Sequence, residues 1–204
     1  AMSLDIVMGY TGMNSFGHAA FFGMGGYTVG ILASHFGATS FWIILPTTLI
    51  TCALLSAIIG YFTLRVSGVY FLLVTMAFGE LLYAVADKWS SLTGGMDGMS
   101  IPKPDLGFAI QWTSGNIFCF VLTIFLICYY LLYRFMRSSF GRTLVGVREN
   151  EGRMRCIGFN TWSVKYVGVI LAGVIGGIAG LLYVYAYGIV VPSNFGLETS
   201  ALPM

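Results

Sequence analysis

Residues 134–165 read RFMRSSFGRTLVGVRENEGRMRCIGFNTWSVK, and this stretch decides how the rest of the chain is arranged. Seven of the ten Lys and Arg residues lie in it, against only two acids, Glu149 and Glu151. Strongly apolar segments flank it on both sides. In a membrane protein, a loop rich in Lys and Arg stays in the cytoplasm. This basic loop therefore predicts the orientation of every other segment.

The composition indicates an integral membrane protein. Of the 204 residues, 57% are hydrophobic and only 9% are charged, and the mean hydropathy is +0.85. A soluble domain carries about 25% charged residues. The excess apolar surface must therefore face lipid, which favours an all-α polytopic helix bundle. Because the basic residues form one loop between apolar segments, nucleic-acid binding is excluded.

Five apolar segments predict membrane spans that alternate in direction. A stretch such as Phe41–Leu64, 24 residues without a charge, is about 36 Å long as a helix and crosses a bilayer with some tilt. Alternation places the basic loop and the Arg65 turn inside, and Asp87–Trp112 and the segment after the last span outside. The predicted spans are about Gly17–Ser34, Phe41–Leu64, Val69–Ala86, Ile117–Tyr133 and Val164–Gly188.

A glycine-rich segment precedes the first full span. Residues 9–26 read GYTGMNSFGHAAFFGMGG and predict a broken or re-entrant helix, because irregular backbone at membrane depth is tolerated only inside protein or beside a cavity. Half-helix ends at such a break can meet a polar solute. The alternative is a close-packed cytoplasmic turn. The polar candidates for a translocation path in this segment are Tyr10, Thr11, Asn14, Ser15 and His18.

Glu80 is the one acid well inside an apolar run. A charge at this depth is costly and usually faces a bundle interior or a water-filled cavity, so we expect Glu80 to face protein or a cavity and not lipid. Its functional interpretation is pathway lining or gating. The alternatives are a structural hydrogen bond to a neighbouring helix end and a position at the membrane interface.

Glycines spaced four residues apart occur in the last predicted span. Gly173 and Gly177 form one such pair, and Gly176 and Gly180 form the other. Small residues at this spacing let helix backbones approach closely. We interpret them as tight packing within one bundle.

Residues 150–158 read NEGRMRCIG and predict a short helix that Asn150 caps and Gly158 ends. Glu151 suits its first turn, and Met154 and Ile157 share a face because they are three residues apart. The charged neighbours of this face are Arg153 and Arg155. A short cytoplasmic helix between two spans is a natural docking element, and a helix lying on anionic lipid headgroups is the alternative.

The sequence lacks the signatures of ATP binding and catalysis. None of the three lysines is followed by Ser or Thr, so the chain has no Walker A loop. The two histidines, His18 and His35, lie far apart without zinc-site spacing, and the four cysteines show no pairing or metal pattern. We predict no enzymatic active site, no metal and no cofactor in this chain.

Four ordered motifs carry a family resemblance: GYTGMNSFGHAAFFGMGGY, LVTMAFGELL, SLTGGMDG and FGRTLVGVRENEGRMRCIGFN. They resemble the inner-membrane permease of branched-chain amino acid ABC importers, and most of all its M-type subunit. The resemblance runs from Leu4 to the end of the chain. The sequence departs from the family at Met13-Asn14, where Gln-Leu is common.

The resemblance implies that residues 1–204 form a single transmembrane permease domain, incomplete at both ends, in the bacterial cytoplasmic (inner) membrane. It implies a homologous second permease, two ATP-binding subunits that hold ATP and Mg, and a periplasmic or extracellular solute-binding protein. The short helix then corresponds to the helix that couples to the ATPase. Its residues are Glu149, Glu151, Arg153, Met154, Arg155, Ile157 and Gly158.

The expected function is thus a translocation path for branched-chain amino acids or related amino acids and amides, driven by separate ATPase subunits. The alternative is a secondary transporter or channel for a small polar solute that works alone. It needs its own ion-coupling site, for which Glu80 is nearly the only buried ionisable candidate. A structural membrane subunit is a third possibility. Co-purification with an ATPase separates the first function from the other two.

Overall fold

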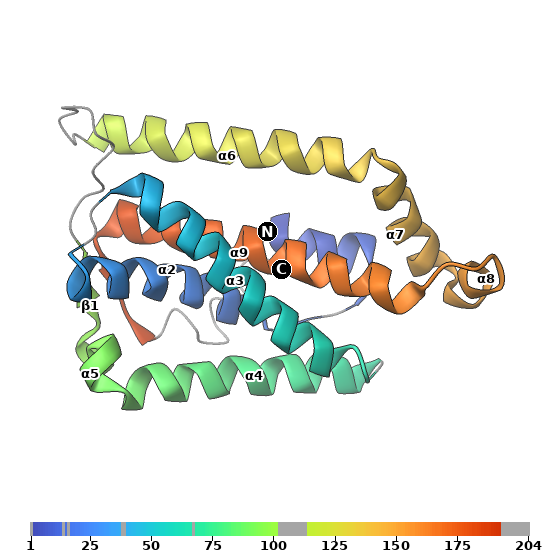
Figure 1. The fold of residues 1–204 in the computed structure, drawn as a ribbon, viewed down its shortest axis with the longest axis horizontal. Helices are drawn as coiled ribbons and strands as arrows, with labels where there is room; N and C mark the ends of the chain where they lie inside the picture. Colours follow the sequence, from blue (N-terminus) through green and yellow to red (C-terminus); the bar gives the residue numbers. More distant parts are fainter. Residues whose placement is uncertain are drawn as a thin grey trace.

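The computed structural model describes residues 2–13, 15, 17–37, 40–66, 68–101 and 114–192. Its long helices run broadly along one axis (Figure 1). Within these described residues, four helices are long and apolar enough to cross a membrane. The expected fifth span is α2 (His18–His35), which has 18 residues and is less apolar than the others. The four are α3 (Phe41–Thr63), α4 (Val69–Lys88), α6 (Ser114–Met136) and α9 (Thr161–Tyr187).

The core of the bundle is the contact of α9 with α2 and α3. A Cβ at Gly25 of α2 would lie 2.1 Å from the carbonyl oxygen of Gly177, and a Cβ at Gly177 would lie 2.3 Å from the sulfur of Cys52 on α3. Backbones come this close only where side chains are absent or small. The glycine pairs of the last span therefore serve packing within this chain, as the sequence analysis favoured.

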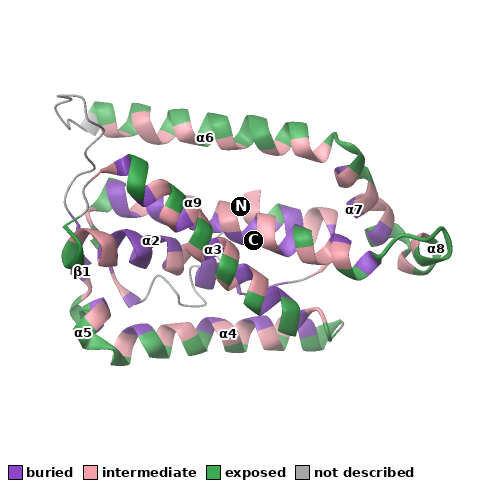
Figure 2. Ribbon diagram, in the orientation of Figure 1, coloured by how far each residue is buried: buried purple, intermediate pink, exposed green. Residues whose placement is uncertain are grey.

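Helices α4 and α6 flank this core on opposite sides (Figure 1). Much of α6 is exposed (Figure 2), and none of the residues in its most apolar stretch of 18 residues is buried. An exposed apolar helix of this length fits a surface that faces membrane hydrocarbon. The bundle thus buries its glycine-rich centre and presents its long apolar side chains outward.

The end predicted to be outside the membrane carries small elements. After α4 come α5 (Ser90–Thr93), the 3-10 helix η2 (Gly95–Asp97) and strand β1 (Met99–Ser100). Strand β1 pairs antiparallel with β2 (Ile189–Val190), which follows α9. Both segments were predicted to lie outside, and the pairing places them at the same end. Residues 102–113 and 193–204 lie outside the described part of the chain.

The opposite end holds the basic loop, which folds into two helices, α7 (Ser139–Glu149) and α8 (Glu151–Cys156). Only α8 was expected. Helix α7 buries Gly141, Leu144 and Val147, three residues at a spacing of three, and contacts α6 and α9. Three buried residues on one face give it a packed side despite its overall polarity.

Candidate functional site

The glycine-rich segment contains the predicted break. The chain begins with α1 (Met2–Asp5) and the π-helix η1 (Ile6–Tyr10). It then turns at Thr11, passes Gly12 with a φ of +71°, and starts α2 only at His18. The break is therefore confirmed, but it is shorter than expected, because residues 23–26 are helical. Asn14 lies outside the described residues.

Two of the path candidates meet at the break. Ser15 and His18 are both buried and line a closed cavity of about 10 Å³ together with Thr63 of α3 and Thr75 of α4. This volume corresponds to about one water molecule. The cavity lies inside the bundle between η1, the break and four long helices, α2, α3, α4 and α9, and these polar groups line it together with apolar side chains.

The other path candidates lie elsewhere. Tyr10 lines a groove of about 350 Å³ that also involves Tyr129 and Tyr133 of α6. Thr11 is buried and lines a separate pocket at the end that was predicted to be cytoplasmic. The structure brings Ser15 and His18 together and does not bring Tyr10 or Thr11 into the same cavity.

Glu80 lies on a face of α4 that the other helices of this chain leave exposed. The buried residues of α4 follow a stripe that includes Thr75 and Gly79, and Glu80 lies next to this stripe and is exposed. Its side chain has no hydrogen-bond partner among the described residues. Within this chain α4 turns another face to the bundle, so the expectation that Glu80 faces protein or a cavity and not lipid stays a prediction.

The short helix α8 has the predicted ends. The Oδ1 atom of Asn150 accepts a hydrogen bond from the backbone N–H of Arg153 at 2.8 Å. Gly158, just past the helix, has a φ of +97°, which glycine adopts with least strain. The cap and the terminal glycine fix α8 as a separate rigid turn between α7 and α9.

A hydrogen-bond network joins α8 to the start of α9. One carboxylate oxygen of Glu151 accepts from Arg155 at 2.7 Å and from the Thr161 hydroxyl at 3.0 Å. The other accepts from the ammonium group of Lys165 at 2.6 Å. Arg155 also donates to Thr161 at 3.0 Å. We call these four residues the Glu151 network, and it ties α8 to the first turns of the central helix.

The network alters the acidity of its carboxylate. The hydrogen bond from Lys165, followed by those from Thr161 and Arg155, holds the pKa of Glu151 below its ordinary value of about 4.5, although partial burial opposes this shift. Hydrogen bonds and positive charges favour the charged form of a carboxylate. Glu151 is therefore ionised throughout the neutral range and keeps the network intact.

The expected apolar face of α8 is divided. Met154 is partly buried and packs toward α7, where a Cβ at Gly146 would lie 3.0 Å from its sulfur. Ile157 is 64% exposed, and Phe159, which the sequence analysis did not single out, is 44% exposed. The two residues that were expected to dock together thus face different surroundings, because α7 occupies one side of α8. The exposed apolar pair is Ile157 and Phe159.

Helix α7 connects this end to the break. The guanidinium group of Arg148 donates a hydrogen bond to the carbonyl oxygen of Gly9. A Cβ at Gly12 would lie 2.9 Å from Cγ of Arg148. Arg148 therefore links α7 to the backbone at and just before the break.

Within the described ranges, the structure contains no group of three or more His, Cys, Asp and Glu residues that could hold a metal ion. The described cysteines are all free.

These features define a polytopic helical membrane protein in which the charged helices gather at one end and an interrupted helix lies in the bundle. The chain belongs to the family of branched-chain amino acid transport system permease components, whose model matches residues 1–204. Membership confirms the resemblance read from the four motifs. It also confirms that the chain is a membrane permease component and not an enzyme.

Similar proteins extend this result. The chain is 27% identical to the high-affinity branched-chain amino acid transport system permease protein LivM of Salmonella typhimurium and to that of Escherichia coli, over 98% of its own length and 52% of each relative. It therefore spans about half the length of these relatives. It is also 30% identical to the nucleoside ABC transporter permease protein NupC of Lactococcus lactis, over 39% of this chain and 23% of that protein. No solved structure matches the chain significantly.

Proposed function

We propose that this chain is part of a permease subunit that carries branched-chain amino acids or related amino acids and amides across the bacterial cytoplasmic membrane. Separate ATPase subunits supply the energy from ATP and Mg, a homologous second permease completes the path, and a solute-binding protein delivers the solute. The family and the two LivM relatives support this proposal. The observation that carries it is the rigid connection from α8 through the Glu151 network to α9.

The proposed path includes the break beside Ser15 and His18. A cavity of about 10 Å³ is too small for an amino acid, so the proposed path requires this region to widen during transport. Opening requires the break to separate from α3 and α4, which contribute Thr63 and Thr75. Single cysteines at Asn14 and Ser15 test this part. Reaction with water-soluble thiol reagents in at least one transport state supports it, and inertness in every state contradicts it.

The proposed docking element is the exposed apolar pair after α8. Ile157 and Phe159 are exposed at the end of the molecule that holds the basic loop. Burying one such side chain contributes about 1.5–3 kcal/mol to the free energy of binding. Loss of one therefore weakens ATPase binding about ten- to a hundredfold. Arg153 and Arg155 lie nearby, where rim charges act mainly on association rate and salt dependence.

Glu80 has a proposed role at the contact with the second permease. An isolated charge at membrane depth costs about 2.5–3.5 kcal/mol on insertion scales, so an exposed Glu80 favours coverage by protein in the assembled transporter. Glu80→Gln is expected to lower transport and leave the complex assembled. Full transport by this variant contradicts the role.

The test of the function uses the assembled transporter in proteoliposomes. Uptake of leucine should require ATP, the ATPase subunits and the solute-binding protein, and adenosine should serve as the comparison solute because one relative is a nucleoside permease. Ile157→Ser should release the ATPase, whereas Met154→Ala, on the side facing α7, should affect binding less. Solute uptake without any ATPase would establish the stand-alone transporter instead.

A further inference from the structure

The end predicted to be cytoplasmic contains a pocket of about 590 Å³, which is separate from the cavity beside Ser15 and His18. It lies between the turn after η1, the turn between α3 and α4, the end of α7 and the start of α9. We call it the basic pocket. The charged residues that line it are Arg65, Arg148, Arg155, Lys165 and Glu151.

The basic pocket has a surplus of positive charge. Its four cations face a single carboxylate, and that carboxylate already accepts hydrogen bonds from Lys165 at 2.6 Å and from Arg155 at 2.7 Å. An added anion therefore meets uncompensated positive charge. No second carboxylate is among the lining residues of this pocket.

The two arginines of the pocket that lie outside the Glu151 network, Arg65 and Arg148, are each held by a contact that leaves further N–H donors for a ligand. The guanidinium group of Arg65 lies 4.5 Å from the ring centre of Tyr61 and donates to its hydroxyl group. Arg148 donates to the carbonyl oxygen of Gly9. A guanidinium group has five N–H donors, so each arginine keeps several for a ligand. Planar, pre-oriented guanidinium groups bind phosphate in a bidentate manner.

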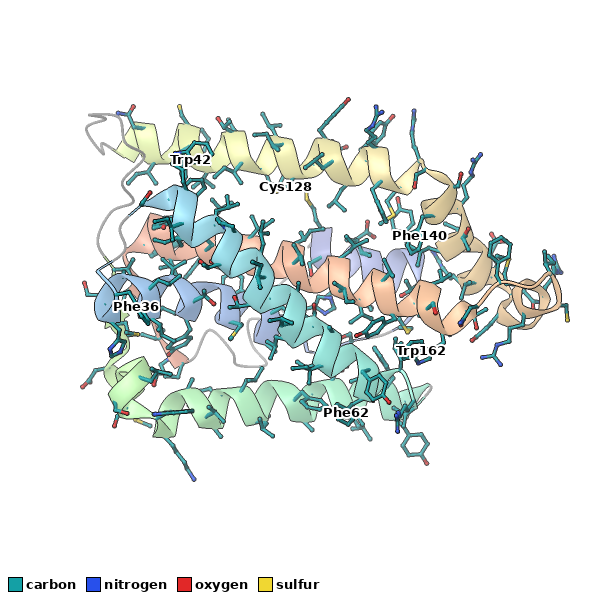
Figure 3. All side chains as sticks on the ribbon, in the orientation of Figure 1. Phe36, Trp42, Phe62, Cys128, Phe140 and Trp162 are labelled. Carbon is teal, nitrogen blue, oxygen red and sulfur yellow. The ribbon has the colours of Figure 1, made fainter. Side chains whose placement is uncertain are left out.

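Aromatic side chains place the basic pocket at the level of lipid headgroups. Trp162, which lines the pocket and is labelled in Figure 3, stacks on Tyr166 with ring centres 5.0 Å apart. It also meets Tyr61 edge-on at 6.1 Å. Trp and Tyr gather where the membrane meets water. Basic pockets between helices at the cytoplasmic surface are suited to anionic headgroups.

We propose that the basic pocket binds the phosphate group of an anionic phospholipid of the cytoplasmic leaflet. Arg65 and Arg148 grip the phosphate oxygens, and the cluster of Tyr61, Trp162 and Tyr166 borders the headgroup. A free phosphate ion shares this recognition chemistry, but it lacks the acyl chains that keep a lipid at the interface. The proposal goes beyond transport and does not depend on which solute is carried.

The experiment is native mass spectrometry of the purified protein in detergent, titrated with phosphatidylglycerol, phosphatidylcholine or inorganic phosphate. One phosphatidylglycerol should bind preferentially. Arg65→Gln should weaken it about tenfold, the loss expected for one charge-assisted bidentate contact. Arg65→Lys keeps the positive charge but loses the planar guanidinium group that binds phosphate in a bidentate manner. It should weaken phosphatidylglycerol binding less than Arg65→Gln does.

The matched control is Arg142→Gln, which removes a cation from α7 that does not line the basic pocket. It should leave phosphatidylglycerol binding unchanged. Equal losses in the Arg65 and Arg142 variants would show general surface attraction and overturn the proposal. Equal binding of phosphatidylcholine, or displacement of the lipid by inorganic phosphate at matched concentration, would overturn it as well. Thermal unfolding of each variant verifies that the fold is retained, and Arg148→Gln provides a second pocket variant.

Discussion

The Glu151–Lys165 pair gives the sharpest prediction about how α8 is held on α9. The side chain of Lys165 is only 20% exposed and that of Glu151 is 35% exposed, and their charged atoms are 2.6 Å apart. A hydrogen bond to a charged group contributes about 1.5–3 kcal/mol, and a fully exposed ion pair about 0.2–1 kcal/mol. Because solvent screens the carboxylate in part, we expect a coupling energy of about 1 kcal/mol, between these limits.

A double-mutant cycle with Glu151→Gln and Lys165→Met measures this coupling energy from unfolding in detergent. The matched control is the pair of Glu151 with Arg155, whose side chain is 67% exposed and lies one helical turn away. That pair should couple by only about 0.3–0.5 kcal/mol. A coupling energy near zero for Glu151 and Lys165, or a larger one for Arg155, would refute the reasoning from burial.

The same variant has a functional consequence under the proposed function. Lys165→Met removes the ion pair between α8 and α9, keeps the hydrogen bonds of Thr161, and leaves Ile157 exposed for docking. The ATPase should therefore stay bound while the solute moved per ATP hydrolysed falls. Transport at the parental rate with the coupling energy lost would show that α8 acts on the bundle by another route.

Three further predictions concern packing and acidity. Gly25→Ala should destabilise the bundle by about 1–3 kcal/mol, because its Cβ would overlap backbone of α9, whereas Gly79→Ala, with open space around it, should be neutral or stabilising in thermal unfolding. Gly12→Ala should lower stability by about 1–3 kcal/mol in the same assay, because φ is +71° and Arg148 is close, and an unchanged melting temperature would contradict this. The lowered pKa of Glu151 should contribute stability that is fully present above about pH 4.5 and is lost as the pH falls through the lowered pKa, so Glu151→Gln should flatten that part of the acid unfolding profile.

The membrane spans could be predicted because their signal is local. An uninterrupted apolar run such as Phe41–Thr63 has no stable alternative to a helix in a bilayer. The cap at Asn150 and the terminal glycine at Gly158 were predictable for the same reason, since each acts on its nearest neighbours. The spacing of the glycines in α9 predicted close helix packing, but it did not identify the helices that pack against α9.

The structure departs from the sequence predictions where contacts between distant parts of the chain determine how a residue is placed. Helix α7 was missed because its three buried positions, Gly141, Leu144 and Val147, lie among charged residues. Its presence gives Met154 a packing partner within the chain, which no spacing in 150–158 reveals. Glu80 was expected to face protein or a cavity, but the buried stripe of α4 contains Gly79 beside it and leaves Glu80 exposed in this chain.

One measurement tests the central claim that α8 and the residues after it receive the ATPase. A single cysteine at Ile157, in a protein whose native cysteines are replaced, is joined by a short thiol cross-linker to the ATPase subunit in membranes. The account predicts a cross-linked product that the matched cysteine at Phe36, at the opposite end of the bundle, does not give. Absence of the product, together with labelling of the Ile157 cysteine by an impermeant reagent added outside intact cells, would contradict the claim.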